Sequence, residues 1–426
     1  MTKIDKTYVT FLLLLQVNFF DIFPLGETIT SAISGYSQKK LMLVVVIIYC
    51  IVSTLGTINT QSTPPSFFGL SISLLLSMVI AITILSAGTY YQSLLSTFLT
   101  SYYFFILLLY FPLRKCLSSS DAVYWLVSIV SKFGFWMAFI KIIQSGAKSF
   151  FNVNIFSLNA TIDAASSDSM RFTFLHFIRL ASASDFVFFS LILLIIGSLI
   201  FKENFMSLKF WTVFITDLFY IIVIGQTRMY ILMSVLAIVA MLFIKLRTSD
   251  RSNNLILFII FSVIGGAITA FLISRISLTS GSRAISLSIR QDAIKYFLSN
   301  INYNGFYGFG FACDDLYGYL IHGSTLLRWG GTIQSGYNYD DVGIFGFLAI
   351  FGYSSMLFFV VFLIQALKSI INSKYKLLSL LIVLVIFMSM GSLSLFNPQR
   401  IMYLPFYLAI LCWLTRANGG KNETGY

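Results

Sequence analysis

Arginine is the residue type whose spacing in this sequence most clearly indicates chemistry. Arg228 ends the short segment Gly225-Gln226-Thr227-Arg228, a turn between two apolar runs, and is therefore expected at the start of a helix. Its guanidinium is permanently charged, and its planar fork matches two phosphate oxygens at once. The free N–H groups and positive dipole end of that helix add to this charge. Arg228 is interpreted either as an anion ligand or as a side chain that reaches the membrane surface.

A second pair of arginines, Arg283 and Arg290, lies seven residues apart in a segment with helical periodicity. On a helix they share one stripe and are separated by about 10 Å along the axis. The other face is apolar, with Ile289, Ala293, Tyr296 and Phe297. The pattern predicts either an interfacial helix or a helix whose arginines reach a pyrophosphate.

Other motifs exclude several kinds of site. The cluster Asn304-Gly305-Phe306-Tyr307-Gly308-Phe309-Gly310 follows no expected strand and precedes no Gly-Lys-Ser/Thr, so it is read as a turn that closes the preceding helix. The two histidines, His176 and His322, lie in different loops, and no CxxC pair is present. Neither a metal site nor a cofactor is expected.

The elements that position these residues are expected to be membrane helices. Charged residues make up 10% of the 426 residues, against roughly 25% in soluble domains. A membrane helix needs about 20 mostly apolar residues. About twelve runs of this kind lie near 7–24, 41–57, 67–87, 90–113, 121–143, 181–201, 207–224, 228–245, 255–274, 341–366, 377–396 and 399–415. The fold class is therefore an all-α polytopic membrane protein, and residues 1–426 are expected to form one integral membrane domain.

The distribution of Lys and Arg in the short loops predicts that both termini are cytoplasmic, with Lys39 and Lys40 as the exception. This orientation leaves two long outer segments, near 144–180 and 275–339. Loops of such length are usually functional or disordered. The second carries many aromatic residues, which favour an ordered loop with short helices, and the active site is expected there.

The sequence resembles the O-antigen polymerases of the Wzy type, which share a superfamily with the O-antigen ligases. The resemblance rests on Arg228, on Arg290 followed by the turn Gly308-Phe309-Gly310, and on Asp340-Asp341-Val342-Gly343-Ile344-Phe345-Gly346-Phe347 with Gly352. The number of helices and the large late outer loop also match. Ligases carry a histidine about eleven residues before the glycine matching Gly343, where this chain reads Gly331-Thr332-Ile333. That difference favours polymerase over ligase.

The resemblance implies a GT-C-like glycosyltransferase in the bacterial inner membrane, with its active site facing the periplasm. Its donor and acceptor are glycan repeat units on undecaprenyl diphosphate. Arg228 and Arg290 are then expected to clamp the leaving pyrophosphate, with Arg283 in reserve and Arg328 as a further cation. A base within about 3 Å of the acceptor hydroxyl is needed, and its candidates are His322, Asp314, Asp315 and Asp341. Aromatic residues such as Tyr307 are expected to stack on sugars.

Membrane lipid is a further expected partner, a chain-length regulator is one that the resemblance raises, and nucleic acid is not expected. Besides a structural or scaffolding membrane protein, for which the clustered outer arginines would have no role, two alternatives stay open from the sequence. The first is an O-antigen ligase of the same superfamily. The second is a flippase or secondary transporter for a lipid-linked oligosaccharide, although no matching halves of the kind found in transporters are evident.

Overall fold

The computed structural model describes residues 1–21, 36–55, 67–153, 155, 173–201, 207–247, 281–323, 326–329 and 332–416. The chain folds as two compact units. Unit 1 comprises Met1–Ala32 and Ser120–Ala284, and unit 2 comprises Ile33–Ser119 and Ile285–Tyr426. The chain therefore passes through each unit twice.

Seven helical segments among the described residues are long and apolar enough to cross a membrane. They are Gln38–Leu55, Gly69–Thr89, Leu94–Cys116, Ser120–Phe151, Leu208–Gly225, Arg228–Lys245 and Ser354–Asn372. The predicted class, a helical multi-pass membrane protein, is thereby confirmed. The total of about twelve spans and the cytoplasmic termini stay predictions, and the apolar run 255–274 lies outside the described residues.

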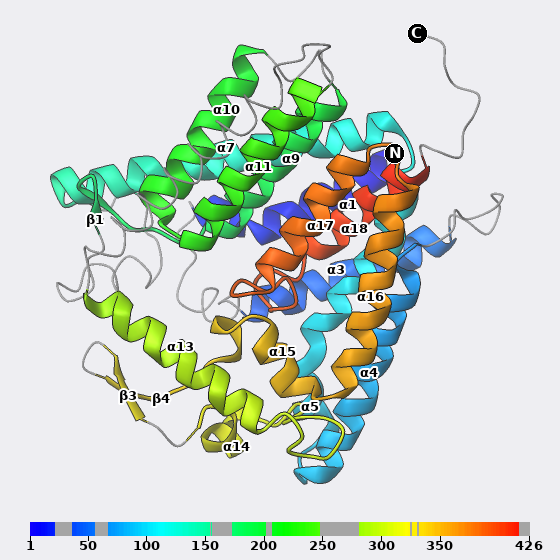
Figure 1. Ribbon diagram of the computed structural model, residues 1–426, viewed down its shortest axis with the longest axis vertical. Coiled ribbons are helices and arrows are strands. Elements are labelled where there is room, and N and C mark those ends of the chain that lie inside the picture. The colour runs from blue at the N-terminus through cyan, green and yellow to red at the C-terminus, as the bar shows by residue number, and fades with distance from the viewer. Residues whose placement is uncertain are drawn as a thin grey trace. The chain divides into compact units, whose positions relative to one another are not determined.

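Unit 1 is built around a central helix, α9, which is buried over most of its length. Its elements are α1 (Lys3–Gln16), η1 (Asn18–Asp21), α7 (Ser120–Phe151), β1 (Thr173–Phe174), β2 (Phe177–Ile178), α9 (Ser184–Ile200), α10 (Leu208–Phe219), the π-helix η3 (Tyr220–Gly225) and α11 (Arg228–Arg247). Helix α9 packs against α7, α10 and α11, and every residue from Phe186 to Ser198 is buried (Figure 1). A helix that is apolar on all sides is expected in such a central position.

Unit 2 has a similar central helix, α18. The first pass of the chain forms α3 (Tyr36–Leu55), α4 (Gly69–Thr89), α5 (Leu94–Ser101), the 3₁₀-helix η2 (Tyr102–Leu109) and α6 (Tyr110–Cys116). The second pass forms α13 (Gly281–Ser299, in this unit from Ile285), α14 (Asp314–Ile321), β3 (Leu326–Trp329), β4 (Thr332–Ser335), η4 (Tyr339–Asp341), α15 (Ile344–Phe351), α16 (Ser354–Asn372), α17 (Lys376–Ser389) and α18 (Tyr403–Arg416). Helix α18 packs against α6, α16 and α17, and it is buried from Tyr403 to Leu414.

The segment predicted as the large outer loop contains α13, α14 and the antiparallel hairpin β3–β4 (Figure 1). Ala293 and Phe297, on the predicted apolar face of α13, are buried in a cluster with Phe309 and Val342. The predicted turn after α13 is also present, because Asn304 and Tyr307 form an isolated antiparallel bridge. Aromatic burial thus orders this segment.

The same segment is tied to the chain just after α4. The hydroxyl of Tyr90 donates to the carbonyl of Phe309 at 2.9 Å, and the side chain of Gln92 donates to the carbonyl of Phe311 at 2.7 Å. Gln92 also accepts from the backbone N–H of Cys313 at 3.0 Å. These hydrogen bonds, of which the first two are buried, fix the glycine-rich turn against the end of α4.

The single span expected at 341–366 is two helices, α15 and α16, which meet at Gly352. Gly352 has a φ of 60°, which ends α15. A Cβ added at Gly352 would lie 2.5 Å from the backbone nitrogen of Gly308, and one added at Gly308 would lie 1.9 Å from the carbonyl oxygen of Ala349. The two glycine motifs therefore pack directly against each other.

Candidate functional site

A small hairpin in unit 1 leads into the first candidate site. Strands β1 and β2 are joined by Leu175 and His176, which both have positive φ, as a two-residue hairpin turn of the mirror-image type requires. The hairpin is held on α7 because Ser145 Oγ donates to the carbonyl of Ile178 at 2.6 Å. The hydroxyl of Ser149 accepts from the N–H of the same residue at 2.9 Å.

This hairpin positions Arg179, the residue that follows β2. Arg179 Nε donates to the carbonyl of Gly225 at 3.1 Å, and the next residue, Leu180, donates its N–H to the carbonyl of Ile224 at 3.0 Å. A second arginine, Arg179, therefore contacts the predicted turn that carries Arg228. Sequence reasoning missed Arg179 because no spacing relates it to Arg228; the available signal was a lone arginine directly before the apolar run 181–201.

Arg228 begins α11, as predicted, after Gln226 in the left-handed conformation and Thr227. Thr227 Oγ1 donates to the carbonyl of Gly225 at 3.3 Å, the same oxygen that Arg179 contacts. Arg228 is half-buried. The first N–H groups of α11 have no intrahelical acceptor, so the turn presents a positive end of the helix dipole next to these cations.

The described residues near this turn include one carboxylate. Asp185, in the first turn of α9, accepts a hydrogen bond from the hydroxyl of Tyr230 in α11. The local balance of two guanidinium groups, one carboxylate and a helix N-terminus is positive. Such an arrangement can bind a phosphate or diphosphate, because the charges are fixed before the anion arrives.

Unit 2 contains a second group of charged residues, around the 3₁₀-helix η4. The side chain of Asn338 accepts from the N–H of Asp340 at 3.2 Å, and Asn397 donates to the carbonyl of Asp340 at 2.8 Å. Arg400, three residues beyond Asn397, lies close enough to act electrostatically on the Asp340 carboxyl. Asp341, a predicted base, is exposed beside this pair. Neither Asn397 nor Arg400 was predicted from the sequence.

Burial raises the pKa of Asp340 to about 6, Arg400 opposes the rise, and Asp341 adds to it. The folded-state pKa therefore exceeds the ordinary value of 3.8, and the folded protein binds this proton more tightly. The resulting stabilisation is complete below about pH 4 and is lost as the pH rises through about 6. We expect the free energy of unfolding of the wild type, relative to Asp340→Asn, to fall over that interval.

Thermal unfolding in detergent over a pH series measures this difference. Asp292→Asn, which removes an exposed carboxylate of α13, is the matched control. Its curve of stability against pH is expected to run parallel to that of the wild type. Curves for Asp340→Asn that also run parallel to the wild type would contradict the assignment.

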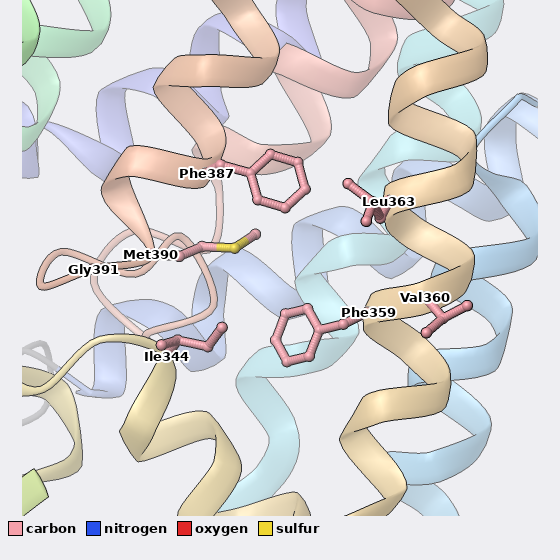
Figure 2. Close-up of a pocket in the computed structure, with 7 residues that line it drawn as sticks. All are labelled: Ile344, Phe359, Val360, Leu363, Phe387, Met390 and Gly391. Carbon is pink, nitrogen blue, oxygen red and sulfur yellow. The ribbon is translucent and has the colours of Figure 1, made fainter.

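An apolar cavity of about 380 Å³ in unit 2 is lined by residues of α15 and α16 and of the end of α17. Helix α15 follows η4 in the sequence. Figure 2 shows its seven lining residues: Ile344, Phe359, Val360, Leu363, Phe387, Met390 and Gly391. The N–H of Ile344 donates to the carbonyl of Met390 at 2.6 Å, which joins the end of the cavity nearest η4 to the loop after α17. The lining suits a hydrocarbon chain.

The other predicted residues of the outer loop have different surroundings. Arg290 is exposed on α13, and Tyr307 is buried with its hydroxyl 2.9 Å from that of Thr89. His322 is half-buried, and its Nδ1 contacts the carbonyl of Tyr337, so Nδ1 is the donor. The side chains of four predicted residues lie outside the described part of the structure: Arg283, Asp314, Asp315 and Arg328.

Arg228 belongs to unit 1 and Arg290 to unit 2. Their predicted pairing as a pyrophosphate clamp stays a prediction. Arg179, in contrast, belongs to the same unit as Arg228 and contacts the carbonyl of Gly225, three residues before it. Comparisons of this chain with protein-family models, curated proteins and solved structures found no match.

Proposed function

We propose that this chain is a membrane glycosyltransferase that polymerises glycan repeat units carried on undecaprenyl diphosphate, as an O-antigen polymerase does. The reaction belongs at the periplasmic face of the bacterial inner membrane. The observation that carries the proposal is the contact of Arg179 with the Gly225 carbonyl, three residues before Arg228. This contact brings one guanidinium group to the turn at which Arg228 begins α11, and we propose that both arginines and the helix N-terminus bind the diphosphate there.

In the proposed reaction, a hydroxyl of one lipid-linked unit attacks the anomeric carbon of the growing chain. A new glycosidic C–O bond forms, and the bond from that carbon to the diphosphate oxygen breaks. The electron pair leaves with undecaprenyl diphosphate, whose growing negative charge Arg179 and Arg228 stabilise. The hydroxyl proton passes to a base, for which Asp341, Asp314, Asp315 and His322 are the candidates.

Two features of unit 2 support the substrate class. The cavity lined by Phe359, Leu363 and Phe387 is apolar and of a size that accommodates part of an isoprenoid chain. The outer segment is rich in aromatic side chains, such as Tyr296 and Tyr337, whose ring centroids lie 5.3 Å apart. We propose that aromatic side chains of this segment stack on the sugar rings. A chain-length regulator is a partner that such a polymerase would take.

Deleting the gene in its native host and running the surface polysaccharide on a gel tests the proposal. We expect loss of the long-chain ladder while a single repeat unit stays attached to its acceptor. Loss of every unit would instead indicate the ligase or the flippase alternative. An unchanged ladder would overturn the proposal.

A further inference from the structure

Unit 1 buries a carboxyl group that the proposed function does not use. Asp217, near the end of α10, is completely buried within the membrane-spanning segment Leu208–Gly225. Ionisable residues at such depth are costly, and they are usually functional. Asp217 is the only Asp or Glu that is fully buried among the described residues.

The hydrogen bonding of this carboxyl is incomplete for an anion. Ser190 Oγ of α9 donates to Asp217 Oδ2 at 2.9 Å. Asp217 Oδ1 is buried and has no hydrogen-bond partner among the described residues. A carboxylate needs several donors to replace its hydration, and one hydroxyl supplies a small part of that.

The third side of this site is closed by α7. A Cβ added at Gly134 would lie 2.1 Å from Ser190 Oγ and 3.5 Å from Asp217 Oδ2, so the backbone of α7 packs directly on the pair. Ser131, one helical turn before Gly134, is also buried, and its hydroxyl has no partner among the described residues. The carboxyl and two serine hydroxyls thus belong to one tightly sealed seam between α7, α9 and α10.

Among the residues that the structure describes, no cation compensates the Asp217 carboxyl in this seam. The protonation of Asp217 is affected by its burial and by the hydrogen bond from Ser190. On α7, Lys141 is buried seven residues beyond Gly134, which is about 10 Å along the helix. The remaining titratable groups on the elements packed against α10 are Asp121, Tyr124, Lys132 and Lys148 on α7, Asp185 on α9, Lys209 on α10 itself and Tyr220 on η3.

We propose that Asp217 is a proton-binding site within the membrane, and that release of its proton is linked to separation of α10 from α7 and α9. A neutral carboxyl fits the sealed seam, whereas the anion requires water to enter it. One carboxyl and two hydroxyls offer too few oxygens for a metal cation, which takes six or more in sites of hard ions.

The backbone beside Asp217 offers a place for such a rearrangement. The π-helix η3 begins three residues later, at Tyr220, and ends at Gly225, whose carbonyl contacts Arg179. A π-helix interrupts the regular α-helical register and is frequent at functional sites. A shift of α10 that opens the seam therefore also moves the turn that carries Arg228.

Infrared titration of the full-length protein in lipid nanodiscs tests the proton site. We expect a carboxylic-acid C=O stretching band at neutral pH that disappears as the pH is raised. Above pH 7, where Asp340 is ionised, the band should be absent from Asp217→Asn and present in Asp185→Asn, whose carboxyl lies in the same unit beside Tyr230. Ser190→Ala keeps the Asp217 carboxyl but removes its donor, so the band should persist to higher pH.

Ser190→Ala keeps the test decisive if Asp217→Asn does not fold. Identical carboxylic-acid bands in the wild type and Asp217→Asn, or a titration that Ser190→Ala leaves unchanged, would overturn the proposal. Loss of the band on adding Na⁺ at constant pH would overturn it in favour of a metal-ion site. Because the readout is spectroscopic, it is independent of whether the chain polymerises glycans.

Discussion

Replacing Arg228 with alanine is expected to slow glycan polymerisation by about 10²–10³-fold, the effect of losing one preorganised group that stabilises charge in the transition state. The reason is that Arg228 begins α11 on the turn whose Gly225 carbonyl Arg179 contacts. Arg179→Ala should have an effect of the same order. The rate is measured with purified protein and lipid-linked repeat units. In cells, the length of the polysaccharide ladder is compared between variants that are present in the membrane in equal amounts.

The matched control is Lys209→Ala, which removes an exposed cation from α10 of the same unit and should leave the rate unchanged. Arg228→Lys keeps the charge but loses the planar fork, so an intermediate rate is expected if two phosphate oxygens are bound together. A normal ladder in both Arg228→Ala and Arg179→Ala would remove the diphosphate-binding role of this turn.

Local features of the sequence were read correctly. The period of the apolar residues predicted the face of α13 that contains Ala293 and Phe297, and both are buried. The turn before Arg228 was predicted from the break between two apolar runs, and the turn around Gly308 was predicted from its clustered glycines, of which Gly305 and Gly310 have positive φ. Signals of this kind depend on neighbours within one or two helical turns, so one sequence suffices to detect them.

Contacts between distant segments were not predictable from the same information. Arg179 reaches Gly225 because a hairpin docks on Ser145 and Ser149, and neither serine forms a recognisable motif. Lys39 is a comparable case, since it breaks the charge pattern of the short loops. Its Nζ donates to the carbonyl of Gln399, beside Arg400, and the general charge rule does not predict a contact between residues so distant in the sequence.

Hydrophobicity alone also could not give the helix boundaries in unit 2. The run 341–366 is mainly apolar, yet it contains the break between α15 and α16 at Gly352. In the same way, α18 is as apolar as a lipid-facing helix but is covered by α6, α16 and α17. The composition of a helix indicates that it is kept away from water. It does not indicate whether the helix is surrounded by lipid or by other parts of the protein.

Replacing Gly308 with alanine is expected to lower the free energy of unfolding of unit 2 by about 3 kcal/mol, the upper part of the range for overpacking. The added Cβ would lie 1.9 Å from the carbonyl oxygen of Ala349, and a backbone atom cannot move aside as a side chain can. Displacing Ala349 would also break its 2.7 Å hydrogen bond from the N–H of Phe309. Denaturant unfolding in detergent, combined with limited proteolysis of residues 285–343, measures the loss.

Gly88→Ala is the matched control, because a Cβ at Gly88 in α4 meets no atom within 4 Å. Alanine is also the better helix former, so this variant should be as stable as the wild type or slightly more stable. The contrast matters for the resemblance to O-antigen polymerases, since Gly308 and Gly352 are among the residues on which it rests. If Gly308→Ala unfolds as the wild type does, close packing is not the reason for these glycines, and the motif would need a role in substrate binding instead.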